Sequence, residues 1–386
     1  MNFLPQQYIE DKKLKIRHNY LTSQFSDYKK IFKKIEKVVK KNDFTLGTEV
    51  DLFENNIKKL IKQKYVVAVG SGTDGLMLSL KCLGIGEGDE VITTPYTFYA
   101  TIGAIVSAGA IPKFVDVKDD YNINPDLIEK AITKKTKAIL PVHWSGRVCE
   151  MEKIIDISKK YKIPIIEDSC HAIEATYKKK FAGTFGEFGC FSLHPLKNLN
   201  VWGDGGYVVV KNKKNYEKML LLRNHGLKGR NINVIFGYNS RLDTIQAVVA
   251  NHLLKKIKFI TSKRITNSLY LERNLKEIKQ LIFKDRQKNL KEVFHLYEFR
   301  VKNFKLRDKL VNFLKSKGID AKIHYPIPMH LQPAAKVYNI KKGSYPTTEK
   351  IAKSTISLPV HEYIKLKDLK FMINTIKKFF NESTIL

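Results

Sequence analysis

Seven short apolar runs, rich in β-branched residues, alternate with stretches of helical periodicity in the first part of the chain. The runs fall at 65–69, 90–94, 113–117, 137–142, 163–167, 190–193 and 206–210. Such alternation is typical of a mostly parallel sheet that is covered by helices on both sides. The sequence therefore predicts an α/β fold built around a mostly parallel, seven-stranded sheet.

The pattern changes after the seventh run. Residues 242–280 are predicted to be helical, and a smaller α+β segment follows, with strand-like runs at 295–297 and 321–323. A chain of 386 residues can bury a large core and is expected to form two domains. We expect a large domain at residues 15–250 and a smaller α+β domain at residues 251–386.

Three segments carry the candidate chemistry, and the first surrounds Lys197. Ser192 lies five residues before this lysine, and a Gly-Asp-Gly-Gly run follows at 203–206. A buried lysine with a lowered pKa can form a Schiff base with an aldehyde, most often pyridoxal phosphate (PLP). The phosphate of PLP needs a hydroxyl, which Ser192 can supply. A surface lysine is the alternative, because the chain has 69 Lys and Arg residues.

The second segment is the apolar run at 163–167, which is followed by Asp168. Open α/β sheets bind their ligands at the carboxyl ends of the strands, and Asp168 falls at such an end. A carboxylate there can keep a pyridinium nitrogen protonated, which makes PLP an electron sink. The alternative role for Asp168 is an N-cap of the next helix.

The third segment is the glycine-rich turn 70–75, which lies between the run at 65–69 and a predicted helix at 76–83. A turn that opens a helix presents unpaired N–H groups and a dipole that favour a phosphate. The turn matches neither a P-loop nor a dinucleotide-binding fingerprint. An ordinary strand-to-helix turn is the alternative.

Together, and in this order, the three segments resemble the DegT/DnrJ/EryC1/StrS aminotransferases, which are PLP-dependent sugar aminotransferases of the aspartate aminotransferase fold. Further matches cover nearly the whole chain, at 43–47, 53–54, 71–74, 86–92, 95–98, 223–226, 237–243, 324–326, 330–332 and 357–359. The resemblance implies the PLP-dependent transferase fold type I.

The resemblance also implies a role for each matching residue. Lys197 would form the Schiff base and move the proton, and Asp168 would pair with the pyridine nitrogen. The other implied contacts are His171 for the phenolic oxygen, Phe98 for the ring face, Gly72, Thr73 and Ser192 for the phosphate, and Asn239 for the phosphate of the other subunit. The active site would then be shared within a homodimer.

The implied reaction moves an amino group from an amino acid, with glutamate expected, to the keto group of a nucleotide-linked deoxy sugar. By resemblance to family members, the residues at 197–199 and 203–206 favour a 3-keto over a 4-keto sugar. The product would serve a surface glycan or a secondary metabolite. The segment 194–196 and Asp204 depart from the commoner family pattern, which bears on the substrate and not on the cofactor.

Three alternatives remain. The acceptor is a smaller ketone such as a sugar phosphate, or the protein is a PLP-dependent sugar dehydratase, or it is a non-catalytic regulatory protein on the same fold. Dehydratases of this kind replace the Schiff-base lysine with histidine, and a regulatory protein would be expected to lose Lys197 or Asp168.

The formal net charge of +31 at pH 7 suggests a polyanionic partner. However, the lysines are scattered, and no RNA-binding or zinc-finger signature is present. Residues 29–41, for example, are predicted to form an amphipathic surface helix. Its apolar face consists of Ile31, Phe32, Ile35, Val38 and Val39. We expect no nucleic-acid partner, although the charge can attract an anionic substrate such as a nucleotide diphosphate.

The four cysteines, at positions 82, 149, 170 and 190, match neither a zinc site nor a disulfide framework. Residues 1–7 lack the apolar core of a signal peptide, and no apolar run is long enough to span a bilayer. We therefore expect a cytoplasmic protein with no bound metal and no membrane association.

Overall fold

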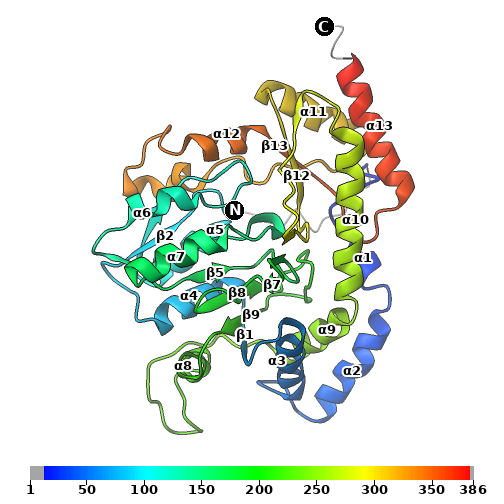
Figure 1. Cartoon of the computed structure of the whole chain (residues 1–386). Coiled ribbons are helices and arrows are strands. Elements are labelled where there is room, and N and C mark those ends of the chain that lie inside the picture. The colour runs from blue at the N-terminus through cyan, green and yellow to red at the C-terminus, as the bar shows by residue number, and fades with distance from the viewer. Residues whose placement is uncertain (1–12, 383–386) are drawn as a thin grey trace.

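The computed structural model describes residues 13–382, so the expectation about residues 1–7 lies outside the described residues. It shows a central sheet flanked by helices and a smaller layer above it (Figure 1). The strands of the central sheet are β1 (Tyr65–Val69), β2 (Glu90–Thr93), β3 (Ile111–Phe114), β4 (Thr136–Ile139), β5 (Ile166–Asp168), β8 (Phe188–Ser192) and β9 (Gly206–Val210).

Two hydrogen-bonded groups of strands, β1-β9-β8-β5 and β4-β2-β3, make up this sheet. Parallel bridges from Ile139 to Ile165 and from Val142 to Asp168 join β4 to β5. β9 runs antiparallel to its neighbours β1 and β8, and the other pairings are parallel. The predicted mostly parallel, seven-stranded sheet is therefore confirmed, with strand ends shifted by a few residues.

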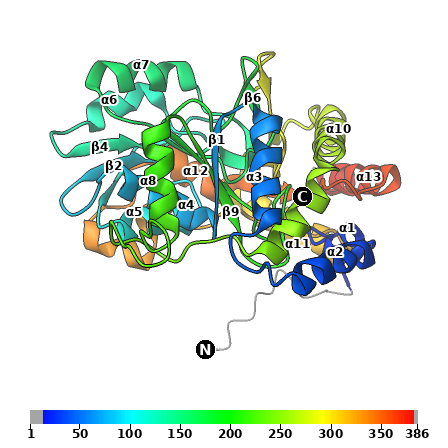
Figure 2. The same cartoon turned by 90° about the horizontal axis from the view of Figure 1, so that it is seen from below.

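The sheet is buried on both faces, because alternate side chains of its strands belong to different hydrophobic clusters. In β1, Val67 and Val69 pack on one side and Val66 and Ala68 on the other. The first cluster includes α4 (Gly72–Cys82), α5 (Tyr99–Ser107) and α8 (Lys213–Arg223), and the second includes α2 (Tyr28–Lys40), α3 (Thr48–Ile61) and α9 (Thr244–Leu254). Figure 2 shows α3 and α8 on either side of β1.

Helix α2 is amphipathic, but only part of its apolar face is buried. Ile31 and Val38 are buried, whereas Phe32 and Val39, which lie on the same face, are 53% and 48% exposed. The helix touches the protein along a narrow stripe, and each exposed residue stands one position, or about 100°, beyond a buried one. Phe32 contacts Tyr28 and Trp202 at the edge of this stripe.

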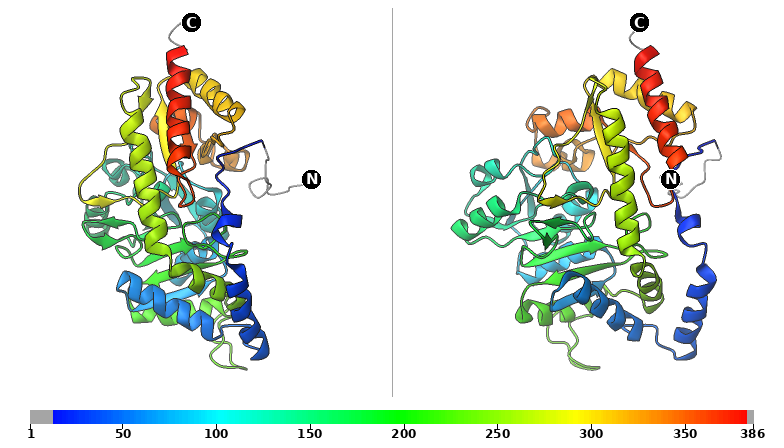
Figure 3. Two further views of the ribbon diagram at one scale, coloured as in Figure 1. Left: turned by 90° about the vertical axis from the view of Figure 1, so that its right-hand side faces the viewer. Right: turned by 45° about the vertical axis from the view of Figure 1, so that its right-hand side comes forward.

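A second layer is built on the antiparallel sheet β10-β12-β13. It contains β10 (Leu281–Ile282), β12 (Tyr297–Val301), β13 (Thr355–Leu358), α10 (Ile257–Leu275), α11 (Phe304–Ser316) and α13 (Leu366–Glu382). Figure 3 shows α10 and α13 running side by side along it. The strand expected at 321–323 is reduced to a single bridge between Lys322 and Ser357.

Two segments cross between the layers. Ile16, near the N-terminus, packs in the core of the second layer. In the other direction, Ile351 and Ala352 of α12 (Pro346–Ser354) pack in the core of the first. We propose that the domains divide near residue 250, with these two crossings as exceptions.

Among residues 13–382, no helix is long and apolar enough to cross a membrane.

Candidate active site

A cavity of about 380 Å³ lies at the carboxyl end of β5 and is lined by residues of both layers. It brings together seven of the eight residues predicted for the site, namely Gly72, Thr73, Phe98, Asp168, His171, Ser192 and Lys197. Asn239 is not among the lining residues. It is exposed on the segment between α8 and α9, where it forms a bridge with Asn224.

The start of α4 forms one end of the cavity. Ser71 caps this helix by accepting the Asp74 N–H at 3.0 Å, which leaves the N–H groups of Gly72 and Thr73 at the open helix end. Ser192 lies beside them, and its Oγ accepts the His194 N–H at 3.2 Å, so its hydroxyl proton can be donated. The helix end and this hydroxyl suit a phosphate.

Gly72 shows how tight this end is. A Cβ atom at this position would lie 2.8 Å from both Cys170 Sγ and Ser192 Cβ. The α4 backbone therefore packs directly against the end of β8 and the residues that follow β5. A side chain at this position would displace Cys170 or Ser192, so glycine is needed to keep Ser192 beside the helix end.

Lys197 is held by its backbone. Its N–H donates to the His194 carbonyl at 3.0 Å, and its own carbonyl accepts from Asn200 Nδ2 at 2.8 Å. The preceding residue, Leu196, has a left-handed φ of 75°. Burial lowers the pKa of the Lys197 ammonium, and the nearby Cys170 and Asp168 partly offset this effect. The lowered pKa favours the neutral amine that attacks an aldehyde.

Asp168 is 6% exposed at the end of β5, and two donors fix its carboxylate. Thr101 Oγ1 donates to Oδ2 at 2.8 Å, and the Cys170 N–H donates to Oδ1 at 3.2 Å. Thr101 has one hydroxyl proton, which it gives to the carboxylate, so it accepts the proton of Thr97 at 2.6 Å. The Thr97–Thr101–Asp168 chain thus orients the acid through the first turn of α5.

His171 is oriented by a backbone donor. The Ser145 N–H donates to its Nδ1 at 3.3 Å, so the neutral ring carries its proton on Nε2. Burial and the charge of Lys197 hold the pKa of His171 well below 6.5. The ring lies 4.2 Å from that of His295. His171 is therefore a neutral hydrogen-bond donor.

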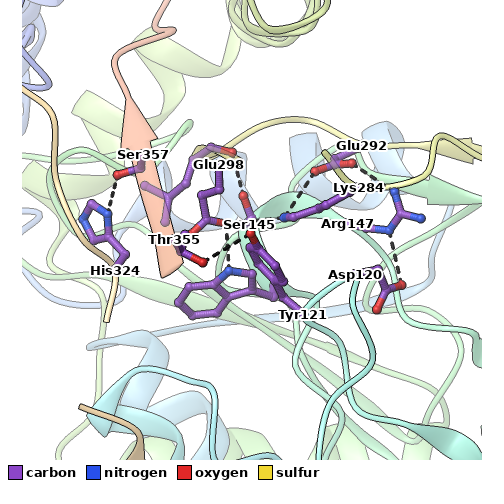
Figure 4. Close-up of polar contacts among 12 residues, drawn as sticks. Asp120, Tyr121, Ser145, Arg147, Lys284, Glu292, Glu298, His324, Thr355 and Ser357 are labelled. Carbon is purple, nitrogen blue, oxygen red and sulfur yellow. Dashed lines mark hydrogen bonds and ion pairs between the residues drawn. The ribbon is translucent and has the colours of Figure 1, made fainter. Parts of the chain in front are cut away.

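A buried network holds the turn that bears this Ser145 amide (Figure 4). Ser145 has a left-handed φ of 62°, and its Oγ donates to the Leu296 carbonyl at 2.6 Å. Trp144 Nε1 donates to Glu298 at 2.9 Å, and Lys284 lies 3.4 Å from the same carboxylate. Because both acid and lysine side chains are at most 2% exposed, the network ties the turn rigidly to the second layer.

One wall of the cavity comes from the N-terminal segment and the second layer. We call it the histidine wall, and it consists of His18, Tyr20, Arg264, His295, Lys322, His324, Tyr325 and His361. The sequence analysis matched His324 and Tyr325 to a family motif, but it did not predict the other wall residues as part of the site. They are scattered over the chain, so no local pattern could have grouped them.

Comparison with known proteins places this geometry in context. The model of the DegT/DnrJ/EryC1/StrS aminotransferase family matches residues 26–377. The pleiotropic regulatory protein of Geobacillus stearothermophilus is 36% identical over 93% of this chain and 97% of its own length. The dTDP-3-amino-3,4,6-trideoxy-alpha-D-glucose transaminase of Streptomyces venezuelae is 32% identical over 89% and 90%, respectively.

Two solved structures are similar to this chain over most of its length. DesV from S. venezuelae, in complex with a ketimine intermediate, superposes with a TM-score of 0.91 and 31% identity, covering 95% of this chain and 98% of that one. The PLP form of the putative sugar aminotransferase Spr1654 from Streptococcus pneumoniae gives 0.86 and 25%, covering 91% and 96%.

Proposed function

Because the chain belongs to the DegT/DnrJ/EryC1/StrS aminotransferase family, we propose that it is a PLP-dependent aminotransferase whose acceptor is a nucleotide-linked keto sugar. The observation that carries this proposal is the convergence of Lys197, Asp168 and the open end of α4 on one cavity. These groups supply an amine, an acid and a phosphate site, which are the three contacts that PLP chemistry requires.

Each predicted site residue that lines the cavity has a proposed contact with the cofactor. Gly72, Thr73 and Ser192 would hold the phosphate, and Phe98, which also lines the cavity, would lie against the ring. When bound, PLP would withdraw electrons from the carbon that loses a proton. Asp168, whose carboxylate is fixed by Thr101, would keep the ring nitrogen protonated, and His171, whose Nδ1 accepts from Ser145, would donate its Nε2–H to the phenolic oxygen.

Lys197 has two tasks. Its lowered pKa makes it a nucleophile that holds the cofactor in the resting enzyme. Once an amino acid had displaced it, the free amine would be the base that takes up and returns the proton of the amino-bearing carbon. The backbone bonds of Lys197 fix the point from which its side chain lines the cavity.

The relatives support the substrate class. The S. venezuelae relative is named for a 3-amino deoxy sugar carried on dTDP, which agrees with a 3-keto acceptor. Glutamate is the proposed amino donor, and the product would enter a surface glycan or a secondary metabolite. The four cysteines are unpaired, which suits the reducing cytoplasm as the site of reaction.

We also propose a homodimer in which Asn239 contacts the cofactor phosphate of the partner. Asn239 is exposed, and its segment carries the apolar Ile232, Val234 and Phe236, which are 60%, 46% and 96% exposed. Side chains of this kind on an exposed segment are typical of a surface covered by another protein. A two-fold dimer is the commonest arrangement that would cover both copies.

Incubation of the purified protein with PLP tests the function. We expect an absorbance band of the lysine-bound cofactor, its loss on adding glutamate, and its return with a nucleotide-linked 3-keto sugar. A protein that binds PLP but never responds to amino acids would act as a regulator, the alternative suggested by the G. stearothermophilus relative. Release of water without amino transfer would indicate a dehydratase, and return of the band only with smaller keto phosphates would indicate a different acceptor.

A further inference from the structure

Two cations belong to the histidine wall, and one of them, Arg264, is paired with a buried carboxylate. Arg264 is 3% exposed, and it donates to the Tyr20 hydroxyl at 2.7 Å and to the carbonyls of Phe294 and His295 at 3.3 Å. Its Nε lies 3.6 Å from the buried carboxylate of Glu362. The charge of this guanidinium is therefore balanced by Glu362, and its hydrogen bonds hold the wall together.

Lys322 differs from Arg264 in its exposure. Its side chain is 32% exposed, and its Nζ lies 3.4 Å from Asp320 Oδ2. That same oxygen accepts the His18 N–H at 2.9 Å, so Asp320 is shared. An ammonium has three donors, and Asp320 engages one of them. Lys322 thus keeps donors for a ligand in the cavity that it lines.

Apart from Asp320, the neighbours of Lys322 in the wall are polar but uncharged. His18 and His324 have ring centroids 6.1 Å apart, and His324 Nδ1 lies 2.7 Å from Ser357 Oγ. Burial, followed by the charge of Lys322, lowers the pKa of both rings, that of His324 to about 4. The wall residues that line the cavity include no carboxylate. At neutral pH, Lys322 is therefore the charge that this part of the wall offers to a ligand.

We propose that Lys322 is an anion subsite that binds a carboxylate of the amino donor, with His18 and His324 beside it. This assignment rests on the proposed aminotransferase function. In an amino acid, the carboxylate is bonded to the carbon that bears the amino group. It must therefore lie close to the point where Lys197 is displaced. Lys197, Lys322 and His324 all line this one cavity, so an amino acid that reacts at Lys197 enters the space that Lys322 faces.

The diphosphate of a nucleotide sugar is the other anion that enters such a cavity. It is separated from the keto carbon by the sugar ring and therefore extends away from Lys197. We therefore assign Lys322 to the donor carboxylate, and the two half-reactions distinguish it from the diphosphate.

Separate half-reactions test the assignment. In the first, the PLP form of the holoenzyme reacts with glutamate, and in the second, the amino form of the cofactor reacts with the keto sugar. For Lys322→Met we expect the KM for glutamate to rise about tenfold or more, as for a lost charge-assisted hydrogen bond, while kcat changes little. We expect the keto-sugar half-reaction to stay unchanged and Lys322→Arg to restore most of the affinity.

Lys302→Met is the matched control, because Lys302 is an exposed lysine of the second layer that does not line the cavity. It removes the same charge and should leave both half-reactions unchanged. Calorimetric titration with glutarate, an unreactive dicarboxylate, repeats the comparison without turnover. Thermal unfolding of each variant shows whether it is folded, and Lys322→Gln replaces Lys322→Met if that variant unfolds.

Three results would overturn the assignment. They are an unchanged KM for glutamate in Lys322→Met, an equal loss in Lys302→Met, and a loss confined to the keto-sugar half-reaction, which would give Lys322 to the diphosphate. A wild-type protein that reacts with no amino acid at all would instead refute the proposed function, so the two failures are distinguishable.

Discussion

Thr101 provides a test of how the site is organised. Its hydroxyl contacts Asp168, the proposed partner of the pyridine nitrogen, although the two residues belong to no common sequence motif. We consider Thr101→Val, which keeps the shape of the side chain and removes its hydroxyl. The change deletes the 2.8 Å bond to Asp168 Oδ2 and leaves the Thr97 hydroxyl without its 2.6 Å acceptor. Asp168, which is 6% exposed, gains little from water in exchange.

The magnitude follows from these contacts. A hydrogen bond to a charged group contributes about 1.5–3 kcal/mol, and about 1.4 kcal/mol corresponds to a factor of ten in rate. If the bond orients Asp168 in the transition state, the glutamate half-reaction should slow roughly 10- to 100-fold. The assay is stopped-flow absorbance of the bound cofactor, together with the ¹⁵N chemical shift of ring-labelled cofactor, which reports on the proton at the ring nitrogen.

Two controls separate orientation from simple destabilisation. Thr101→Ser keeps the hydroxyl and should restore most of the rate and the ¹⁵N shift. Thr93→Val removes a comparable bond, from a fully buried hydroxyl to the Leu140 carbonyl at 2.8 Å, away from the cavity. It should cost stability and leave the ¹⁵N shift alone. A Thr101→Val enzyme with wild-type rate and shift would refute the reasoning.

Four further outcomes are expected. Borohydride should trap PLP on Lys197, and mass spectrometry of Lys197→Ala should show no such adduct. Ser192→Ala should weaken PLP binding about tenfold or less in an absorbance titration, since one neutral hydrogen bond contributes about 1 kcal/mol. Lys197→Ala and Asn239→Ala chains, co-expressed, should form mixed dimers with one site that has both Lys197 and Asn239, and this site should bind PLP as tightly as wild type if the site is shared. Burial lowers the pKa of His171, so the unfolded chain binds more protons below pH 6.5. Its contribution to stability is therefore present above pH 6.5 and lost as pH falls, and thermal unfolding of wild type and His171→Gln at pH 7 and pH 5 should show a smaller acid destabilisation in the variant.

The fold could be predicted largely from local patterns. Each strand of the central sheet is a short apolar run, because both of its faces are buried, and such a run needs no distant information to be recognised. The same holds for the start of α4, where a glycine turn follows β1 directly. The family resemblance was confirmed by the match over residues 26–377. The roles of Lys197, Asp168 and Asn239 stay predictions.

What the sequence did not show depends on contacts between distant segments. Thr101 and Asp168 are 67 positions apart, and no local sequence pattern indicates that their side chains are in contact. The same reason explains the partial burial of the apolar face of α2. Periodicity identified its apolar residues, but which of them are buried depends on how α2 sits against α9, so the exposure of Phe32 could not be predicted.

The two halves of the cavity come from different parts of the fold. The half of the cavity that suits PLP comes from strand ends of one sheet, between Gly72 and Lys197, and the sheet fixes their spacing. The histidine wall comes instead from the N-terminal segment, α10 and the loops around β12 and β13. Its residues can change without disturbing the sheet, so substrate preference can vary while the cofactor half stays constant. An exchange at Lys322 should therefore alter the choice of substrate and leave PLP affinity unchanged, whereas an exchange at Gly72 should affect PLP affinity first.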